Sequence, residues 1–248
     1  MTRARALVVR SGANPFLSLS ASGHIEIVER VSHTIEAVDP REGALETSAD
    51  LVIFTSQVAV ERAFGDASLA PVFRKIAKGA GVVAVGGATG DALTARGIRT
   101  ELVAGGSAES VLERLPPHLE GKRVLLPCGE DAGLELPERL HSRGARVARI
   151  VLYRKVANPR DPGLEREIVE RPFAAFCTTS PSAARWLFAG LGEAAAARLR
   201  RTPAVVLGPF TRRFLESHGV ARIEVTEEAR FAEAVALLEA LAAASVET

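Results

Sequence analysis

Two short runs of hydroxyl residues in this 248-residue chain have the types and spacing of an anion-binding site. Thr55-Ser56 follows the apolar residues 51–54, and Thr179-Ser180 follows the apolar residues 174–177. A helical pattern comes next in both places, so each pair is expected at a strand-to-helix turn. A serine at such a turn can cap the new helix, and the helix dipole and free backbone N–H groups there favour a bound anion.

The two turns belong to a larger internal repeat. Three pairs of strand-like segments match in the same order: residues 51–56 with 175–180, 82–89 with 204–211, and 7–12 with 124–129. The offsets are all about 120 residues, so the sequence predicts two related halves that arose by duplication.

The elements around these turns predict an α/β fold. Apolar strands alternate with amphipathic helices, and several strands are apolar on both faces, as in parallel sheets. Ligands of such folds bind beyond the carboxyl ends of the strands. This rule places the following residues on a common edge: Ser11, Ser56, Gly86, Gly87, Gly129, Ser180, Gly208 and Pro209.

Some local expectations are less regular. Residues 25–28 and 35–39 are expected as two extended segments, and Leu17 and Leu19 suggest a short helix or turn between the first strands. Ser107 is expected as a helix N-cap. Residues 158–163 form the clearest turn-rich connector.

Composition excludes several functions. Lys plus Arg at 31 against Asp plus Glu at 30 leaves a net charge of +1, so no overall field attracts nucleic acid or a membrane surface. No segment has the length of a signal peptide or membrane span. Five histidines lie scattered without ligand spacing, so no metal site is expected. Cys128 is expected in a loop and Cys177 in a buried strand, which indicates unpaired thiols in a reducing cytoplasm.

The order and spacing of several motifs resemble the uroporphyrinogen-III synthase family. The matching residues are Phe54-Thr55-Ser56 with Ala59-Val60, Val85-Gly86 with Thr89, residues 126–130, Tyr153-Arg154, residues 180–183, and Gly208-Pro209 with Thr211. The chain departs from the family pattern at Gln57-Val58, at Phe210 and in the serine-rich residues 13–24.

The resemblance implies a reaction. The family cyclises hydroxymethylbilane, a linear tetrapyrrole with eight carboxylates, to uroporphyrinogen III, inverting ring D and losing water. It needs no metal or organic cofactor, so the expected partner is this small polycarboxylate alone. The protein is expected to be a monomer in the cytoplasm. A transient contact with the preceding enzyme of the pathway is also possible.

The resemblance also implies an architecture. Two similar domains, each a parallel β-sheet flanked by helices, are expected on either side of a cleft and joined by a two-stranded connector. Residues 1–37 with 157–248 would form the first domain and residues 41–152 the second. Residues 38–40 and 153–156 would form the connector.

The expected site combines one acid with many polar contacts. Tyr153, the only tyrosine, matches the family's tyrosine beside the cleft and is the candidate proton donor for the departing hydroxyl. The candidate substrate-binding residues are Arg10, Ser11, Thr55, Ser56, Gly86, Thr89, Cys128, Gly129, Ser180, Ser182, Gly208, Pro209 and Thr211. Arg154, Lys155 and Arg212 could also meet carboxylates.

Alternatives stay open at this stage. Tyr153 could be a strand-end aromatic with its hydroxyl in water, and the serines and threonines could be helix caps only. A catalytically inactive homologue that binds tetrapyrroles or has a regulatory role would have the same residues at the carboxyl ends of its strands. A bilobal binding protein would be expected to carry a secretion signal. A phosphate-loop enzyme is disfavoured, because neither Gly86-Gly87 nor Gly105-Gly106 precedes the lysine or spaced glycines of such loops.

Overall fold

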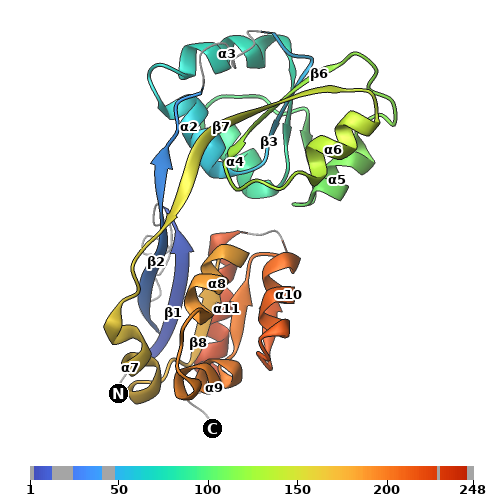
Figure 1. The fold of residues 1–248 in the computed structure, drawn as a ribbon. Helices are drawn as coiled ribbons and strands as arrows, with labels where there is room; N and C mark the ends of the chain where they lie inside the picture. The colour runs from blue at the N-terminus through green and yellow to red at the C-terminus, as the bar shows by residue number, and fades with distance from the viewer. Residues whose placement is uncertain (1–2, 13–24, 41–47, 228–229, 245–248) are drawn as a thin grey trace. The chain divides into compact units, whose positions relative to one another are not determined.

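The computed structural model describes residues 3–12, 25–40, 48–227 and 230–244 of the chain. The chain divides into two compact units (Figure 1). Unit 1 comprises Met1–Thr34 with Val156–Thr248, and unit 2 comprises Ile35–Lys155.

Unit 1 contains a parallel sheet in the order β10-β9-β8-β1-β2. Its strands are β1 (Ala4–Ser11), β2 (Ile25–Ala37), β8 (Ala175–Thr178), β9 (Ala204–Val206) and β10 (Ile223–Val225). Its helices are α7 (Pro162–Glu170), α8 (Pro181–Phe188), α9 (Glu193–Arg201), α10 (Pro209–Ser217) and α11 (Phe231–Ala244). Leu7 and Val9 of β1 pack in the cluster formed with α7 to α10, while Ala6 and Val8 pack on α11. The sheet is therefore buried on both faces, as the apolar strands predict.

Unit 2 contains a second parallel sheet in the order β7-β6-β3-β4-β5. Its strands are β3 (Leu51–Phe54), β4 (Gly81–Ala84), β5 (Leu102–Val103), β6 (Arg123–Gly129) and β7 (Arg146–Ala157). Its helices are α2 (Gln57–Gly65), α3 (Ala70–Gly79), α4 (Gly87–Ala95), α5 (Ala108–Arg114) and α6 (Glu135–Ser142). Helices α2 to α4 cover one face, where the rings of Phe54, Phe64 and Phe73 pack at centroid distances of 5.6 to 6.3 Å. Helices α5 and α6 cover the other face.

The two sheets have the same strand order when the repeat is applied. Strands β6, β3 and β4 of unit 2 occupy the places of β1, β8 and β9 in unit 1, which are the three pairs matched in the sequence. The predicted repeat is thus confirmed in the topology. In each unit the direction of strand progression reverses beside β3 or β8, and ligands of open α/β sheets bind beyond the carboxyl ends of the strands at such a reversal.

Several local expectations need correction. Residues 25–28 and 35–39 are not separate segments, because β2 runs without a break from Ile25 to Ala37. Cys128 lies inside β6 rather than in a loop, since the strand continues to Gly129. Residues 158–163 include a helix start, where the Asp161 side chain caps α7 and Pro162 occupies the first turn. The expectation for Leu17 and Leu19 lies outside the described residues.

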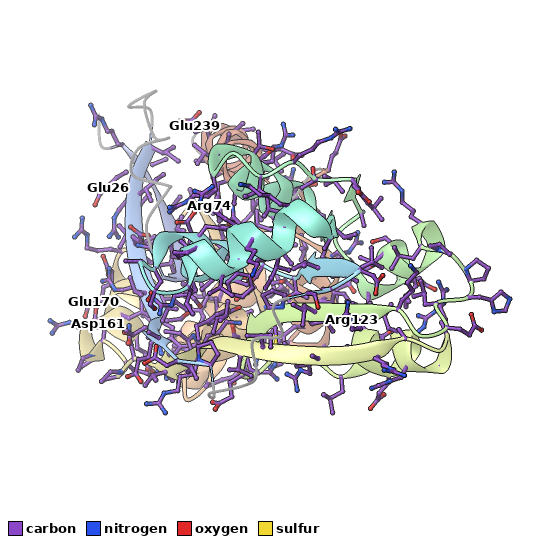
Figure 2. All side chains as sticks on the ribbon, turned by 90° about the horizontal axis from the view of Figure 1, so that it is seen from above. Glu26, Arg74, Arg123, Asp161, Glu170 and Glu239 are labelled. Atoms are coloured by element: carbon purple, nitrogen blue, oxygen red, sulfur yellow. The ribbon has the colours of Figure 1, made fainter. Side chains whose placement is uncertain are left out.

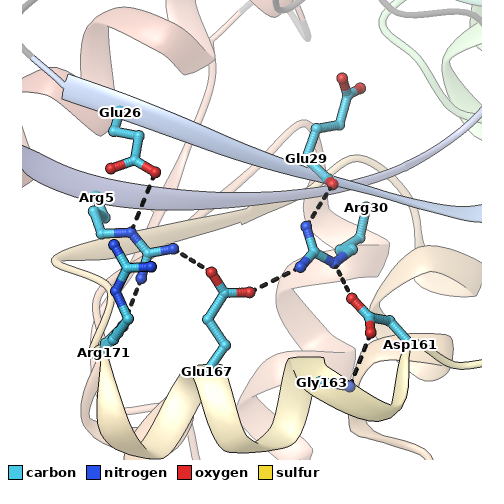
Figure 3. A network of polar contacts seen from close by, with 8 residues as sticks. All are labelled: Arg5, Glu26, Glu29, Arg30, Asp161, Gly163, Glu167 and Arg171. Atoms are coloured by element: carbon cyan, nitrogen blue, oxygen red, sulfur yellow. Dashed lines mark hydrogen bonds and ion pairs between the residues drawn. The ribbon is translucent and has the colours of Figure 1, made fainter.

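A network of ion pairs holds α7 onto the sheet of unit 1 (Figure 3). The Glu167 carboxylate pairs with Arg5 of β1 through one oxygen and with Arg30 of β2 through the other, at 2.8 Å. Arg30 also pairs with Asp161 at 2.9 Å. Because Arg5 is buried, the network neutralises a charge that would otherwise be costly there.

Other charged side chains project to solvent. Arg74 on α3 and Arg123 at the start of β6 are exposed, as is Glu170 at the end of α7 (Figure 2). Both signs are present among them, consistent with the near-zero net charge of the sequence.

Candidate functional site

The carboxyl edge of the unit 2 sheet gathers seven of the candidate residues. Thr55 and Ser56 follow β3, Gly86 and Thr89 follow β4, Cys128 and Gly129 end β6, and Tyr153 lies in β7. These positions lie at and beside the reversal of strand order, where a ligand is expected.

Ser56 is the N-cap of α2 and contacts Tyr153, the candidate acid. Its backbone is extended (φ −157°, ψ 155°), and its Oγ accepts a hydrogen bond from the Ala59 N–H at 3.1 Å, which confirms the predicted N-cap. The same Oγ lies 3.0 Å from the Tyr153 hydroxyl. The hydroxyl is therefore bonded to a protein side chain and not to water alone.

This contact leaves a proton for a ligand. Two hydroxyl groups carry two protons, and one of them is used in the bond between Ser56 and Tyr153. Either hydroxyl can donate in that bond, so the other remains able to donate. The pair can thus supply one O–H donor at the start of α2.

Burial controls the acidity of this pair. Tyr153 is 4% exposed, and burial raises the pKa of its phenol above the ordinary value near 10, an effect that the hydrogen bond to Ser56 partly opposes. This shift does not change the protonation state at neutral pH, because even a phenol with an ordinary pKa near 10 is protonated there. The Tyr153 phenol can therefore act as a general acid but not as a base.

Gly129 makes room for the tyrosine ring. It faces Tyr153 across the β6–β7 pair, where the register shifts by one residue after Cys128. A Cβ atom on Gly129 would lie 2.7 Å from Tyr153 Cζ, closer than real Cβ contacts. The Glu130 N–H also donates to the Tyr153 carbonyl at 2.9 Å. Gly129 therefore positions the tyrosine, a role that the sequence did not indicate.

Cys128 lies close by but is not set up as a nucleophile. The residue is buried, and burial raises the pKa of its thiol, with Arg149 opposing the shift. The group therefore stays a neutral thiol at pH 7.

The glycines after β4 and β5 approach each other. Gly86 precedes α4, and a Cβ atom on it would lie 3.3 Å from the Gly106 Cα. Gly106 has φ 93° and donates its N–H to the Val85 carbonyl at 2.7 Å. Ser107 then caps α5 as predicted, in a reciprocal capping box with Ser110. This loop extends the carboxyl edge of the unit 2 sheet, although its residues are not among the candidates predicted from the sequence.

The carboxyl edge of unit 1 gathers the other candidates. Ser180 caps α8 by accepting the Ala183 N–H at 3.2 Å, as predicted, and its Oγ lies 3.0 Å from the Ser182 Oγ. Gly208 and Pro209 begin α10, and Thr211 is buried in its first turn.

Arg10 and Ser11 end β1 in the same unit. Arg10 is buried and pairs with Glu29, while its Nη1 has no hydrogen-bond partner among the described residues. Burial lowers the pKa of its guanidinium. The Ser11 Oγ lies 3.3 Å from the Oγ of Ser32, which donates to the Arg10 carbonyl at 2.9 Å.

Two residues of this edge were missed. Ser32 is fully buried, and its Oγ lies 2.9 Å from the Nδ1 of His33. His33 pairs with Ser11 after a one-residue register shift, just as Tyr153 pairs with Gly129. Extending the repeat to match β2 with β7 could have identified His33 from the sequence.

The remaining candidate cations already have carboxylate partners. Arg154 pairs with Glu36 at 2.7 Å, Lys155 with Asp131 at 3.0 Å and Arg212 with Glu216 at 2.7 Å. A bound carboxylate would have to replace one of these partners, so each contributes less than an unpaired cation.

Within the described ranges, no cluster of three or more His, Cys, Asp or Glu side chains is arranged to hold a metal ion. No helix of residues 3–12, 25–40, 48–227 or 230–244 combines the length and apolarity of a bilayer span.

The fold and these edges define a class of two-unit α/β proteins with parallel sheets, and comparison with known proteins identifies the family. The sequence model of the family described as uroporphyrinogen-III synthase HemD matches residues 6–236. A provisionally named uroporphyrinogen-III synthase of Methanothermobacter thermautotrophicus is 34% identical over 184 residues, 70% of this chain and 71% of the relative. The chain belongs to the uroporphyrinogen-III synthase family, whose members are hydro-lyases of tetrapyrrole biosynthesis.

Solved structures agree on the fold. The crystal structure of a mutant uroporphyrinogen III synthase from the extreme thermophile Thermus thermophilus has a TM-score of 0.66 at 22% identity, covering 96% of this chain and 98% of that one. The synthetase from Helicobacter pylori has a TM-score of 0.63 at 15% identity, covering 95% and 98%. At such identities these likenesses bear on the fold alone.

Proposed function

We propose that this chain is an active uroporphyrinogen-III synthase, which closes hydroxymethylbilane to uroporphyrinogen III with inversion of ring D, and that Tyr153 assists as the acid. Family membership supports the reaction. The observation that carries the assignment of the acid is the 3.0 Å contact between Tyr153 and Ser56 at a helix start.

The chemistry needs one proton donor and many positioning contacts. The C–O bond of the hydroxymethyl group breaks, and the departing oxygen takes a proton to leave as water. A C–C bond forms to the substituted α-carbon of the terminal ring. The C–C bond that already held this carbon breaks and re-forms at the ring's free α-carbon, which inverts the ring, and the proton released there balances the one consumed. The Tyr153–Ser56 pair has the spare hydroxyl proton for the first step, and general acid help of this kind typically contributes about 10²–10⁴-fold in rate.

The N-termini of four helices can bind carboxylates of the substrate. The free N–H groups of α2 and α4 in unit 2, and of α8 and α10 in unit 1, can each receive a carboxylate, with a dipole contribution of about 0.3–1 kcal/mol. Because the linear substrate closes unaided to the uninverted isomer, the enzyme mainly has to select a geometry. This is catalysis by positioning and differential binding.

The experiment is incubation of the purified chain with hydroxymethylbilane, followed by separation of the product isomers. We expect isomer III well above the amount formed without protein. Isomer I alone, together with tight binding of the substrate, would instead identify a catalytically inactive homologue.

The setting of the enzyme is a further part of the proposal. Cys128 and Cys177 are both free and buried, which supports work in a reducing compartment such as the cytoplasm. We also propose that the enzyme acts as a monomer on its small polycarboxylate substrate. Light scattering during size-exclusion chromatography, with and without the preceding pathway enzyme, tests the monomer and any transient contact.

A further inference from the structure

Phe210 differs from the other phenylalanine, tyrosine and tryptophan residues that the structure describes because it is exposed. It lies in the first turn of α10, and 51% of its surface is accessible. The others that the structure describes are buried or partly buried. One exposed apolar side chain is common on protein surfaces and by itself indicates nothing. The residue that contacts the Phe210 ring makes a binding role plausible on physical grounds.

That residue is Arg213, one turn further along α10. Its guanidinium carbon lies 4.7 Å from the centroid of the Phe210 ring, within the range of a cation–π contact. Within the described part of the chain no ion pair joins Arg213 to a carboxylate, whereas the adjacent Arg212 pairs with Glu216 at 2.7 Å. Arg213 can therefore hold the ring in place and still attract an anion.

The pair lies beside the candidate residues of unit 1. Side chains of a helix lean toward its N-terminus, so Phe210 leans toward the carboxyl end of β9. Gly208, Pro209 and Thr211, at the same helix start, are candidate substrate contacts. The repeat matches Phe210 with Ala88 of unit 2, so this aromatic contact has no counterpart after β4.

We propose that Phe210 and Arg213 form a platform for one carboxylated pyrrole ring of the tetrapyrrole, an inference that rests on the proposed function. The ring stacks offset on the phenyl ring, and one of its carboxylates pairs with the guanidinium. Neither side chain is an acid for the departing hydroxyl. A phenyl ring has no acidic proton, and arginine keeps its proton in proteins. The platform therefore governs affinity for the substrate and product, not ring closure.

The test compares variants of the full-length chain. Phe210→Ala, Phe210→Leu, Phe210→Trp and Arg213→Gln are assayed for kcat and KM with hydroxymethylbilane, and for Kd of uroporphyrinogen III by anaerobic calorimetry. Val169→Ala is the matched control, because Val169 is 43% exposed and lies near the end of α7, ahead of β8 and away from the carboxyl edge. Thermal unfolding of each variant checks that the fold is retained, as expected for exposed side chains.

Stacking predicts a particular pattern. Phe210→Ala and Phe210→Leu should each raise KM and Kd about tenfold, Phe210→Trp should keep both near the wild type, and kcat should change less than about twofold. Arg213→Gln should raise Kd several-fold and weaken its dependence on salt. Equal values for Phe210→Ala and Val169→Ala would overturn the platform, and so would a Phe210→Leu variant that binds like the wild type.

The platform and the proposed function can fail separately. If the wild-type chain makes no isomer III, but Phe210→Ala binds uroporphyrinogen III more weakly than the wild type does, the platform is supported and the proposed synthase activity is refuted. A wild-type chain that makes isomer III, with KM and Kd unaffected by Phe210→Ala, would do the reverse.

Discussion

The carboxyl edges of the two units share a backbone plan and differ in chemistry. Both units carry a serine N-cap after the central strand, Ser56 in unit 2 and Ser180 in unit 1. In unit 2 the serine contacts Tyr153, whereas in unit 1 it contacts Ser182. The position equivalent to Tyr153 is His33, whose ring contacts Ser32.

This difference shows how a repeat can keep binding on both edges and specialise one of them. The cap and the helix dipole depend on the local turn, so both copies retain them. The donor depends on one side chain from β7, which is two strands away from β3, so a single substitution can create or remove it. We therefore expect the acid in unit 2 and binding alone in unit 1.

Tyr153→Phe should have the largest effect on this comparison. The variant keeps the ring and its packing but deletes the phenol, so kcat should fall roughly ten- to several-hundred-fold while the product stays isomer III. The matched change in unit 1, His33→Phe, should leave the isomer unchanged and alter kcat much less. Isomer analysis and steady-state kinetics measure both. Full activity in Tyr153→Phe would reduce the residue to packing, and a switch to isomer I would show that it positions the substrate.

The serine caps provide the next largest effect. An aspartate at Ser56 or Ser180 still caps the helix, so stability should hardly change, but its charge should repel a substrate carboxylate and raise KM about tenfold. Aspartate at Ser142, which is exposed at the end of α6 and ahead of β7, is the control that adds the same charge away from the carboxyl edge. Unchanged KM in both variants would remove the two turns from the site, and a change in only one would show which unit binds.

Gly129→Ala tests the positioning of the tyrosine. The added methyl group would lie 2.7 Å from Tyr153 Cζ, so the ring must shift and the contact with Ser56 must lengthen. We expect kcat to fall about tenfold with KM little changed, because a displaced donor loses part of its contribution. Combined with Tyr153→Phe, the change should add little further loss, since both act through one hydroxyl. Additive losses would mean that Gly129 acts on substrate directly.

The local features of both edges could be predicted from the sequence, and the long-range contacts could not. Ser56 and Ser180 were predictable as caps because an N-cap depends on residues within one turn. The Ser56–Tyr153 contact joins residues 97 positions apart and depends on the register of β6 with β7, including its one-residue shift. The sequence does not show such a shift. His33 becomes predictable only once the repeat is extended to match β2 with β7.

The pH dependence should show the smallest effect. Because burial raises the pKa of Tyr153, its phenol stays protonated through neutral pH, and kcat should be flat between about pH 7 and 9. The raised pKa also stabilises the fold below about pH 10, and this contribution is lost as pH rises through the folded-state value. Thermal unfolding and kcat, measured from about pH 6 to 11, should therefore both decline only on the alkaline side, and Tyr153→Phe should lack that part of the decline. A fall in kcat below about pH 7 would contradict this profile, because the Tyr153 phenol does not titrate there.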